Sequence, residues 1–246
     1  MVDPKTPLYR YVSFDRFNQM LFSKELTLVS PSKWDDDFEL YWIKMLNTPE
    51  GEKRLLEFVK PFDGDAEKNI TRIMQLSDYM YRRVYCLCFS KARDAEVLWR
   101  ANANDNRGIM FATTANKLYD LLPESDDIAL EEVQYDLDTA NMSDQFLKSF
   151  RICSKSTLFS NPDNLFSHKR KCFSYEEEVR LIVSPETAPE DRILKRPIPN
   201  LCTLIDGVMV HPLANKEFVS LVELLCSHFN LAFWGQSTVY QFKPLQ

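Results

Sequence analysis

Residues 173–183 read Phe-Ser-Tyr-Glu-Glu-Glu-Val-Arg-Leu-Ile-Val, and the rest of the chain is best understood outward from this stretch. Its alternating side chains predict a β-strand, because successive residues of a strand point to opposite faces of a sheet. One face is apolar and the other carries two carboxylates beside a guanidinium: Val179, Leu181 and Val183 against Glu176, Glu178, Arg180 and Ile182. Such a face is either a charged ladder on the outside of a sheet or the wall of a catalytic cleft. The pattern alone favours the ladder.

Composition limits the class of protein. The chain has 246 residues, 45% of them hydrophobic, with 17 Phe, which indicates a folded globular protein with an ample core. The net charge of −6 provides no general attraction to nucleic acid, although a local basic patch stays open. No apolar run reaches membrane-spanning length, and the first residues, Met-Val-Asp-Pro-Lys, lack a signal-peptide core. We therefore expect a cytoplasmic protein that does not bind membranes.

Several kinds of site are disfavoured by the motifs that are missing. The 6 Cys include no C-x-x-C pair, and the 3 His stand in different segments, so we expect neither a metal site nor a cysteine nucleophile. With 5 Gly in the chain, there is no G-x-G-x-x-G sequence and no P-loop to hold phosphate.

The remaining patterns predict a single α+β domain over residues 1–246, with a helical insertion at about 50–82 lying against the sheet. Expected strands are 8–12, 26–30, 83–90, 107–113, 130–137, 204–210 and 239–242, besides 173–183. Expected helices follow Ser13 or Asp15, begin at Asp94 and Thr114, and span 141–158 and 214–229. Prolines between 185 and 199 predict an extended connection.

An acidic loop at 32–39 has two interpretations. Asp35, Asp36 and Asp37 are consecutive, which favours a solvated turn over a calcium loop with alternating ligands. A divalent cation held by Asp35, Asp37 and Glu39 would instead indicate a metal-dependent phosphodiesterase.

The order of several short motifs resembles a widespread uncharacterised bacterial family, classed as a domain of unknown function. These motifs are Leu8-Tyr-Arg-Tyr11, Leu28-Val-Ser-Pro31 with the loop 34–39, Cys88-Phe-Ser90, Leu98-Trp99, Gly108-Ile-Met-Phe111, Val133-x-Tyr135, Glu176-x-Glu178-x-Arg180 and Val208-x-Val-x-Pro212. The match covers most of the chain. Where the family has Asn-Asp-Pro-Phe-Glu, residues 35–39 read Asp-Asp-Asp-Phe-Glu. The family in turn resembles diverged ADP-ribosyltransferases.

That second resemblance implies a split, mainly antiparallel sheet whose cleft holds NAD as substrate. It implies Glu178 as the catalytic carboxylate with Glu176 beside it, and a dinucleotide held by Arg10, Tyr11, Ser90, Trp99, Tyr175 and Arg180. Breaking the nicotinamide–ribose bond builds positive charge on the sugar, which a fixed carboxylate stabilises. Structural alternatives stay open: Arg10 paired with a neighbouring acid, Ser90 as an ordinary strand-end residue, and Trp99 in the core.

The resemblance therefore implies an ADP-ribosyltransferase with a protein or nucleic-acid acceptor. It also implies a toxin or phage-defence effector with an antitoxin or regulatory protein as partner, which no residue indicates by itself. Besides the phosphodiesterase, the alternative is a non-catalytic domain that uses the same cleft to bind a partner.

Overall fold

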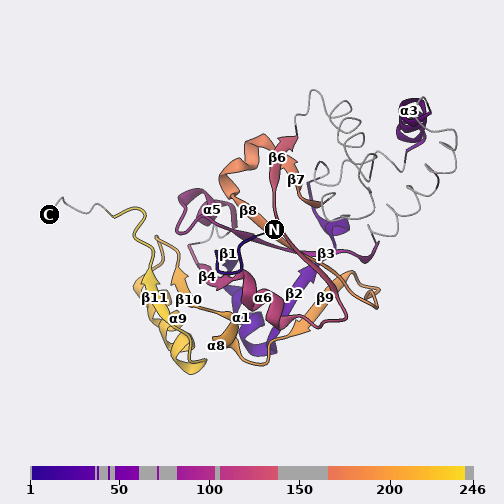
Figure 1. The fold of residues 1–246 in the computed structure, drawn as a ribbon. Helices are drawn as coiled ribbons and strands as arrows, with labels where there is room; N and C mark the ends of the chain where they lie inside the picture. The colour runs from indigo at the N-terminus through magenta and orange to yellow at the C-terminus, as the bar shows by residue number, and fades with distance from the viewer. Residues whose placement is uncertain are drawn as a thin grey trace.

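The computed structural model describes residues 2–36, 38, 44, 48–60, 71, 82–102, 106–137 and 166–241. Its strands are β1 (Pro7–Ser13), β2 (Glu25–Val29), β3 (Tyr85–Ser90), β4 (Gly108–Thr114), β5 (Asp127–Glu132), β6 (Gln134–Leu137), β7 (His168–Arg170), β8 (Glu178–Ser184), β9 (Ile193–Pro197), β10 (Gly207–Val210) and β11 (Phe233–Gln236). Its α-helices are α1 (Phe14–Ser23), α3 (Pro49–Val59), α5 (Glu96–Asn102), α6 (Ala115–Leu121), α8 (Leu201–Leu204) and α9 (Lys216–His228). Two 3₁₀ helices are η1 (Pro31–Lys33) and η3 (Lys171–Glu176). Figure 1 shows their arrangement.

Nine of the described strands form one sheet in the order β11-β10-β4-β1-β3-β2-β9, with β8 pairing both β3 and β5. All pairs in this sheet are antiparallel except β10 with β11. The fold is thus mixed α and β with a largely antiparallel sheet, as the sequence predicted. A separate sheet contains β6 and β7.

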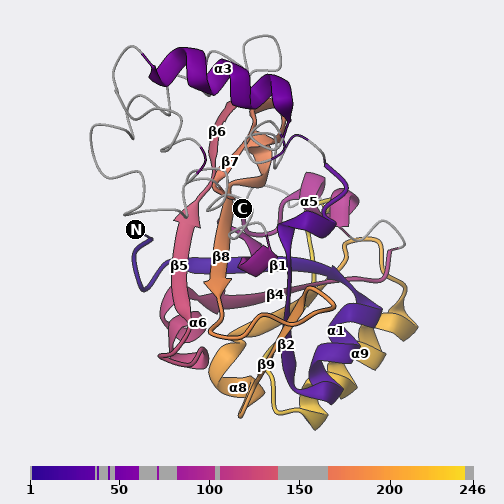
Figure 2. The same cartoon turned by 90° about the vertical axis from the view of Figure 1, so that its right-hand side faces the viewer.

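The large sheet is divided at β3. Strand β1 pairs with β4 along its whole length, from Pro7↔Thr114 to Ser13↔Gly108, but meets β3 at Tyr9↔Ser90 alone. Strand β2 likewise meets β3 only at Val29↔Cys86. Strand β3 instead follows β8 from one end to the other, and Figure 2 shows β5 and β8 running across the direction of β1 and β4. The β3–β8–β5 part therefore diverges from the β1–β4 part, which leaves room between them for side chains or a ligand.

Strand β8 confirms the alternation expected of it. Val179, Leu181 and Val183 are fully buried in the main hydrophobic core. Glu178 and Arg180 lie on the opposite face, where Ile182 belongs to a small separate cluster. Burial of one apolar face fixes the register of a strand, because a shift by one residue would turn the charged side chains into the core.

The start of this strand was predicted too early. Residues 173–176 belong to η3, and Glu177 has a φ of 42°, the left-handed conformation that ends the 3₁₀ helix. The strand consequently begins at Glu178, and Glu176 is the last residue of the 3₁₀ helix instead of a strand residue.

Other boundaries also differ from the predictions. Residues 130–137 form parts of two strands, β5 and β6: the Val133 N–H still donates to the Glu178 carbonyl at the start of β8, whereas the Gln134 N–H donates to the Ser167 carbonyl next to β7. The proline-rich connection contains β9, which pairs with β2. The last described strand is β11, at 233–236, whereas residues 239–241 form no strand.

The helices at both ends of the sequence were predicted well. Helix α1 begins after Ser13, whose Oγ accepts from the Arg16 N–H, and it buries Phe17, Met20 and Leu21. Helix α9 begins after Asn215, whose side chain accepts from the Phe218 N–H. Side-chain capping of free N–H groups explains both starts.

The expected insertion at 50–82 is described only in part. Helix α3 confirms a helix near its start, and Figures 1 and 2 show α3 away from the nine-stranded sheet, not against it. The rest of the insertion, and the predicted helix 141–158, lie outside the described residues. No helix among the described residues has both the length and the apolar character needed to cross a bilayer.

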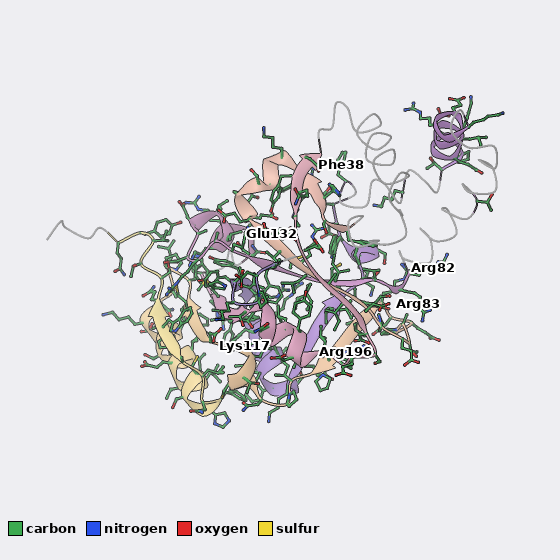
Figure 3. All side chains as sticks on the ribbon, viewed as in Figure 1. Phe38, Arg82, Arg83, Lys117, Glu132 and Arg196 are labelled. Atoms are coloured by element: carbon green, nitrogen blue, oxygen red, sulfur yellow. The ribbon has the colours of Figure 1, made fainter. Side chains whose placement is uncertain are left out.

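Ion pairs join elements at the edges of the fold. Arg196 of β9 donates to both carboxylate oxygens of Asp126, with N···O distances of 2.6–2.8 Å. Lys117 of α6 pairs with Asp206, just before β10. Figure 3 labels Arg196 and Lys117, and neither residue lines the cavity described next.

Candidate active site

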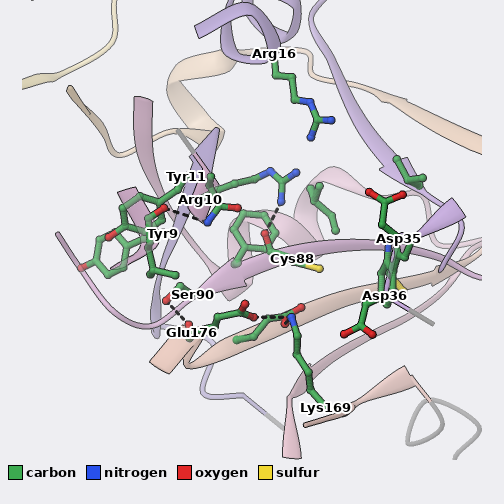
Figure 4. Close-up of a pocket in the computed structure, with 18 of the residues that line it drawn as sticks. Tyr9, Arg10, Tyr11, Arg16, Asp35, Asp36, Cys88, Ser90, Lys169 and Glu176 are labelled. Atoms are coloured by element: carbon green, nitrogen blue, oxygen red, sulfur yellow. Dashed lines mark hydrogen bonds and ion pairs between the residues drawn. The ribbon is translucent and has the colours of Figure 1, made fainter. Parts of the chain in front are cut away.

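A cavity of about 450 Å³ opens where β3 separates from β1 and β2. Its walls come from those strands, from the loop after η1, from α5 and from the segment 169–178. Figure 4 shows Arg10 and Arg16 on one side, Glu176 and Lys169 on another, and Asp35 with Asp36 on a third. The volume is in the range of small-molecule and cofactor sites, about 300–1,000 Å³.

Glu178, the first residue of β8, lines this cavity although its side chain is only 4% exposed. Its Oε1 lies 2.7 Å from Arg180 Nε, and its Oε2 lies 3.1 Å from Lys169 Nζ. Burial by itself would raise the pKa of Glu178, but the Arg180 guanidinium and the Lys169 ammonium outweigh it and lower the pKa below its ordinary value. The carboxylate is therefore fixed in its charged form.

Glu176 has the opposite electrostatic character. Its Oε2 lies 2.6 Å from Lys169 Nζ, and its carboxyl group also lines the cavity. Burial, assisted by the nearby charge of Glu178, raises the pKa of Glu176 to about 7 despite the attraction of Lys169. Two carboxyl groups with separated pKa values in one cavity suit one permanent anion and one proton acceptor.

Arg10 of β1 and Arg16 of α1 face the cavity together. Arg10 Nη1 donates to the Cys88 carbonyl. Burial lowers the pKa of Arg10; electrostatic interaction with Cys88 opposes this shift, and the charge of Arg16 adds to it. Within the described part of the chain, neither guanidinium forms an ion pair with a carboxylate. Two adjacent cations without a described acidic partner are suited to contact an anionic ligand.

Ser90 and Tyr11 line the cavity as well, but their hydroxyl groups hydrogen-bond to backbone groups of the protein. Ser90 Oγ donates to the Glu176 carbonyl at 2.6 Å and accepts from the Ala92 N–H at 2.9 Å. Tyr11 Oη donates to the Ala92 carbonyl and accepts from the Ala95 N–H, both at 3.0 Å. These contacts fix the end of β3 and the start of α5 against the segment that carries Glu176.

Three residues predicted to contact the dinucleotide do not line the cavity. Trp99 is completely buried, packs edge-on against Tyr11 and donates from Nε1 to Asp94 at 2.9 Å. Tyr175 lies exposed on η3, because the segment turns there and does not alternate as a strand would. Arg180 is completely buried and acts through its ion pair with Glu178. The core interpretation of Trp99 matches its position.

The acidic loop forms one wall of the cavity. Asp35 and Asp36 line it, and Asp36 Oδ2 lies 2.9 Å from Arg170 Nη2. Trp34 packs on the Arg180 guanidinium, 4.6 Å from the ring centroid, and this contact ties the loop to β8. Asp37 and Glu39, the other proposed metal ligands, lie outside the described residues. Among the residues that are described, no three His, Cys, Asp or Glu side chains form a metal-binding group.

Sequence patterns gave no indication of Lys169, Arg16 or Cys88 as cavity residues. Lys169 comes from the separate β6–β7 sheet, and nothing in its local sequence relates it to Glu178. Arg16 is an exposed residue in the first turn of α1, the helix that directly follows β1. Cys88 lies in the middle of β3, where every residue from Cys86 to Ser90 lines the cavity.

No protein-family model and no curated protein matches the sequence. Among solved structures, the chain is similar to Thermus sp. 2.9 DarT in complex with ADP-ribosylated ssDNA, with 10% identity, a TM-score of 0.39 and 95% of each chain covered. The complex of that protein with NAD⁺ gives 10% identity and a TM-score of 0.38, covering 95% of this chain and 96% of that one. The complex with carba-NAD⁺ gives 12% identity and a TM-score of 0.37, covering 96% of this chain and 95% of that one. These values describe a distant likeness, and we base the functional proposal on the cavity alone.

Proposed function

We propose that this chain is an ADP-ribosyltransferase-like enzyme that binds NAD in the cavity, cleaves the nicotinamide–ribose bond and transfers ADP-ribose to a protein or nucleic acid. The observation that carries this proposal is that Glu178 and Arg10 face one cavity at the division of the sheet.

The distribution of charge in the cavity supports NAD as the ligand. Arg10 and Arg16 provide a cationic region suited to the diphosphate, while Glu176 and Glu178, whose charges are balanced by Lys169 and Arg180, present carboxyl oxygens across the cavity. NAD has the complementary arrangement, with a positively charged pyridinium ring attached to one ribose and two negative charges on the diphosphate. Attraction between the two arginines and the diphosphate, with the carboxyl oxygens facing the pyridinium end, sets the orientation of the ligand as well as its affinity.

In this orientation the ionised Glu178 acts on the ribose that carries nicotinamide. As the C–N bond breaks, nicotinamide leaves with the electron pair, and the sugar develops positive charge that the carboxylate stabilises. Because Arg180 and Lys169 already fix this carboxylate, it reorganises little during the reaction.

Glu176 accepts the proton of the acceptor. As a hydroxyl or amine of the acceptor forms its bond to the anomeric carbon, its proton passes to the Glu176 carboxylate. A pKa of about 7 suits this step, because general bases are most effective when their pKa lies near the working pH.

Labelled NAD tests the proposal, with protein, RNA and single-stranded DNA offered as acceptors. We expect release of nicotinamide and transfer of label by the native chain, and a decrease of about a hundredfold or more for Glu178→Gln, because one electrostatic stabiliser of the transition state is lost. Glu177→Gln is the matched control, since this neighbouring carboxylate is exposed and does not line the cavity.

Binding of NAD to Glu178→Gln, measured by calorimetry, separates loss of chemistry from loss of fold. Retained binding with lost cleavage supports the assigned role of Glu178. If the native chain neither binds nor cleaves NAD, or if Glu178→Gln cleaves it at the native rate, the proposal is wrong.

A further inference from the structure

Lys169 occupies the position between the two carboxyl groups of the cavity. Its Nζ lies 2.6 Å from Glu176 Oε2 and 3.1 Å from Glu178 Oε2, and its side chain is 11% exposed. The ammonium also lies 4.9 Å from the centroid of the Phe173 ring, on the 3₁₀ helix that carries Glu176. A single cation thus contacts both carboxylates and the element that delivers one of them.

We propose that Lys169 is the positioning residue that allows Glu176 and Glu178 to be ionised together, and so makes Glu176 available as the base. The inference rests on the proposed function, in which Glu176 takes the proton of the acceptor.

The repulsion between two neighbouring carboxyl groups is relieved in one of two ways. They share a proton, in which case one of them is neutral, or a cation lies between them and both are charged. Here the buried Arg180 neutralises Glu178, and Lys169 is the ammonium that reaches Glu176. With both carboxylates ionised, these four side chains have no net charge.

Other polar groups near this cluster do not replace the ammonium. Tyr135 of β6 accepts from the Glu178 N–H at 2.8 Å, and burial raises the pKa of this phenol to about 12. Tyr175, on the same 3₁₀ helix as Glu176, also has a raised pKa, first through burial and then through Glu176. Burial, reinforced by the charge of Glu178, raises the pKa of the Cys88 thiol. All three groups are neutral near pH 7, and Arg10 acts on Glu178 from across the cavity.

The direction of the pH effect follows from these contacts. Lys169 stabilises the charged form of Glu176, so removal of the ammonium raises the pH at which this carboxyl group ionises. An opposite charge at hydrogen-bonding distance shifts a carboxyl pKa by about one unit or more. At neutral pH the variant should therefore hold Glu176 protonated, with its proton shared toward Glu178.

Two measurements on Lys169→Met test the inference. Titration of ¹³C-labelled glutamate carboxyl carbons by NMR, with Glu176 identified by the loss of its signal in Glu176→Gln, gives the ionisation midpoint directly. The pH profile of label transfer from NAD gives the midpoint of the rising limb. We expect both midpoints to rise by about one pH unit or more. Transfer should fall about fivefold near pH 7 and recover near pH 9.

Lys169→Arg retains the charge and should keep both midpoints within about half a unit of the native values. The matched control is Lys91→Met, because Lys91 pairs with Glu132 at 2.7 Å in an exposed Lys–Glu pair outside the cavity. Lys91→Met should leave the NMR titration midpoint of Glu176 and the pH profile of label transfer unchanged. Should Lys169→Met not fold, Lys169→Gln also removes the charge and should raise the NMR midpoint.

The outcomes separate the two proposals. A rate that falls equally at every pH, with an unchanged carboxyl midpoint, means that Lys169 is only structural and overturns the inference. Absence of NAD cleavage by the native chain at any pH overturns the proposed function instead, and the NMR midpoint then decides by itself whether Lys169 controls the ionisation of Glu176.

Discussion

Replacement of Arg180 by methionine removes the buried cation that pairs with Glu178. Arg180 is completely buried, and its Nε and Nη2 lie 2.7 and 3.3 Å from the two oxygens of Glu178. Its Nη1 donates to the Phe166 carbonyl at 2.6 Å. Methionine keeps an apolar stem of similar length, so the change mainly removes charge and hydrogen bonds.

The expected loss of stability is large. Removal of one partner of a buried ion pair costs about 3–5 kcal/mol, because the other charge stays buried without compensation. Lys169 remains 3.1 Å from Glu178 and reduces this effect, so we expect about 3 kcal/mol at neutral pH. The double variant Glu178→Gln/Arg180→Met leaves no uncompensated anion and should be more stable than the single variant by about 1–2 kcal/mol.

The loss should also depend on pH. In the native chain the pKa of Glu178 is lowered from 4.5, so the ion pair stabilises the fold fully above that value and the stabilisation disappears as the pH falls toward the folded pKa. In Arg180→Met, burial raises the pKa of Glu178, and a protonated side chain carries no uncompensated charge. The difference in free energy of unfolding between the native chain and Arg180→Met should therefore be largest near pH 7 and smaller near pH 4.

Urea denaturation followed by circular dichroism, at both pH values, measures this difference. Arg196→Met breaks a partly buried pair with Asp126 away from the cavity, and it should lower stability without changing the cleavage of NAD. An equal loss for Arg180→Met at the two pH values, or a double variant no more stable than the single one, would refute the electrostatic reasoning.

Two further predictions concern the C-terminal part of the fold. A Cβ on Gly207 would lie 2.0 Å from Trp234 Cε2, so Gly207→Ala should lower the free energy of unfolding by about 1–3 kcal/mol. Adding Trp234→Ala to the same chain should recover most of that loss. Thermal denaturation of the single and double variants measures both effects. Asn215 caps α9 through a 2.8 Å hydrogen bond from the Phe218 N–H, so Asn215→Ala should cost about 1 kcal/mol and Asn215→Asp should restore it; an unchanged melting temperature for Asn215→Ala would contradict the cap.

The sequence predicted those elements whose signal is local. Hydrophobic spacing and side-chain caps identified α1 and α9, and apolar runs identified β3 and β4. Strand β9 was missed because prolines surround it, yet Pro197 is tolerated at the end of an edge strand, where its missing N–H breaks no ladder. The turn at Glu177 was missed because a positive φ is uncommon in residues other than glycine, and no glycine or proline marks it.

For the cavity, the sequence was informative about charges on predictable strands and uninformative about contacts between distant segments. The strand pattern placed Glu178 on the face opposite the core, and the family resemblance placed Arg10 on the first strand; both residues line the cavity. Their roles toward NAD stay predictions. Lys169 could not be found in this way, because it reaches Glu176 from a second sheet whose pairing depends on the whole fold.

The position of Ser90 argues for a different role from the one that the resemblance implied. Ser90 stands at the single point where β1 meets β3, and its hydroxyl donates to the Glu176 carbonyl. A serine hydroxyl has one proton to donate, so a ligand could meet only its remaining acceptor lone pair. The division of the sheet opens the cavity, and at the edge of that division Ser90 holds the turn that carries Glu176. We therefore expect Ser90 to position the base instead of binding the dinucleotide.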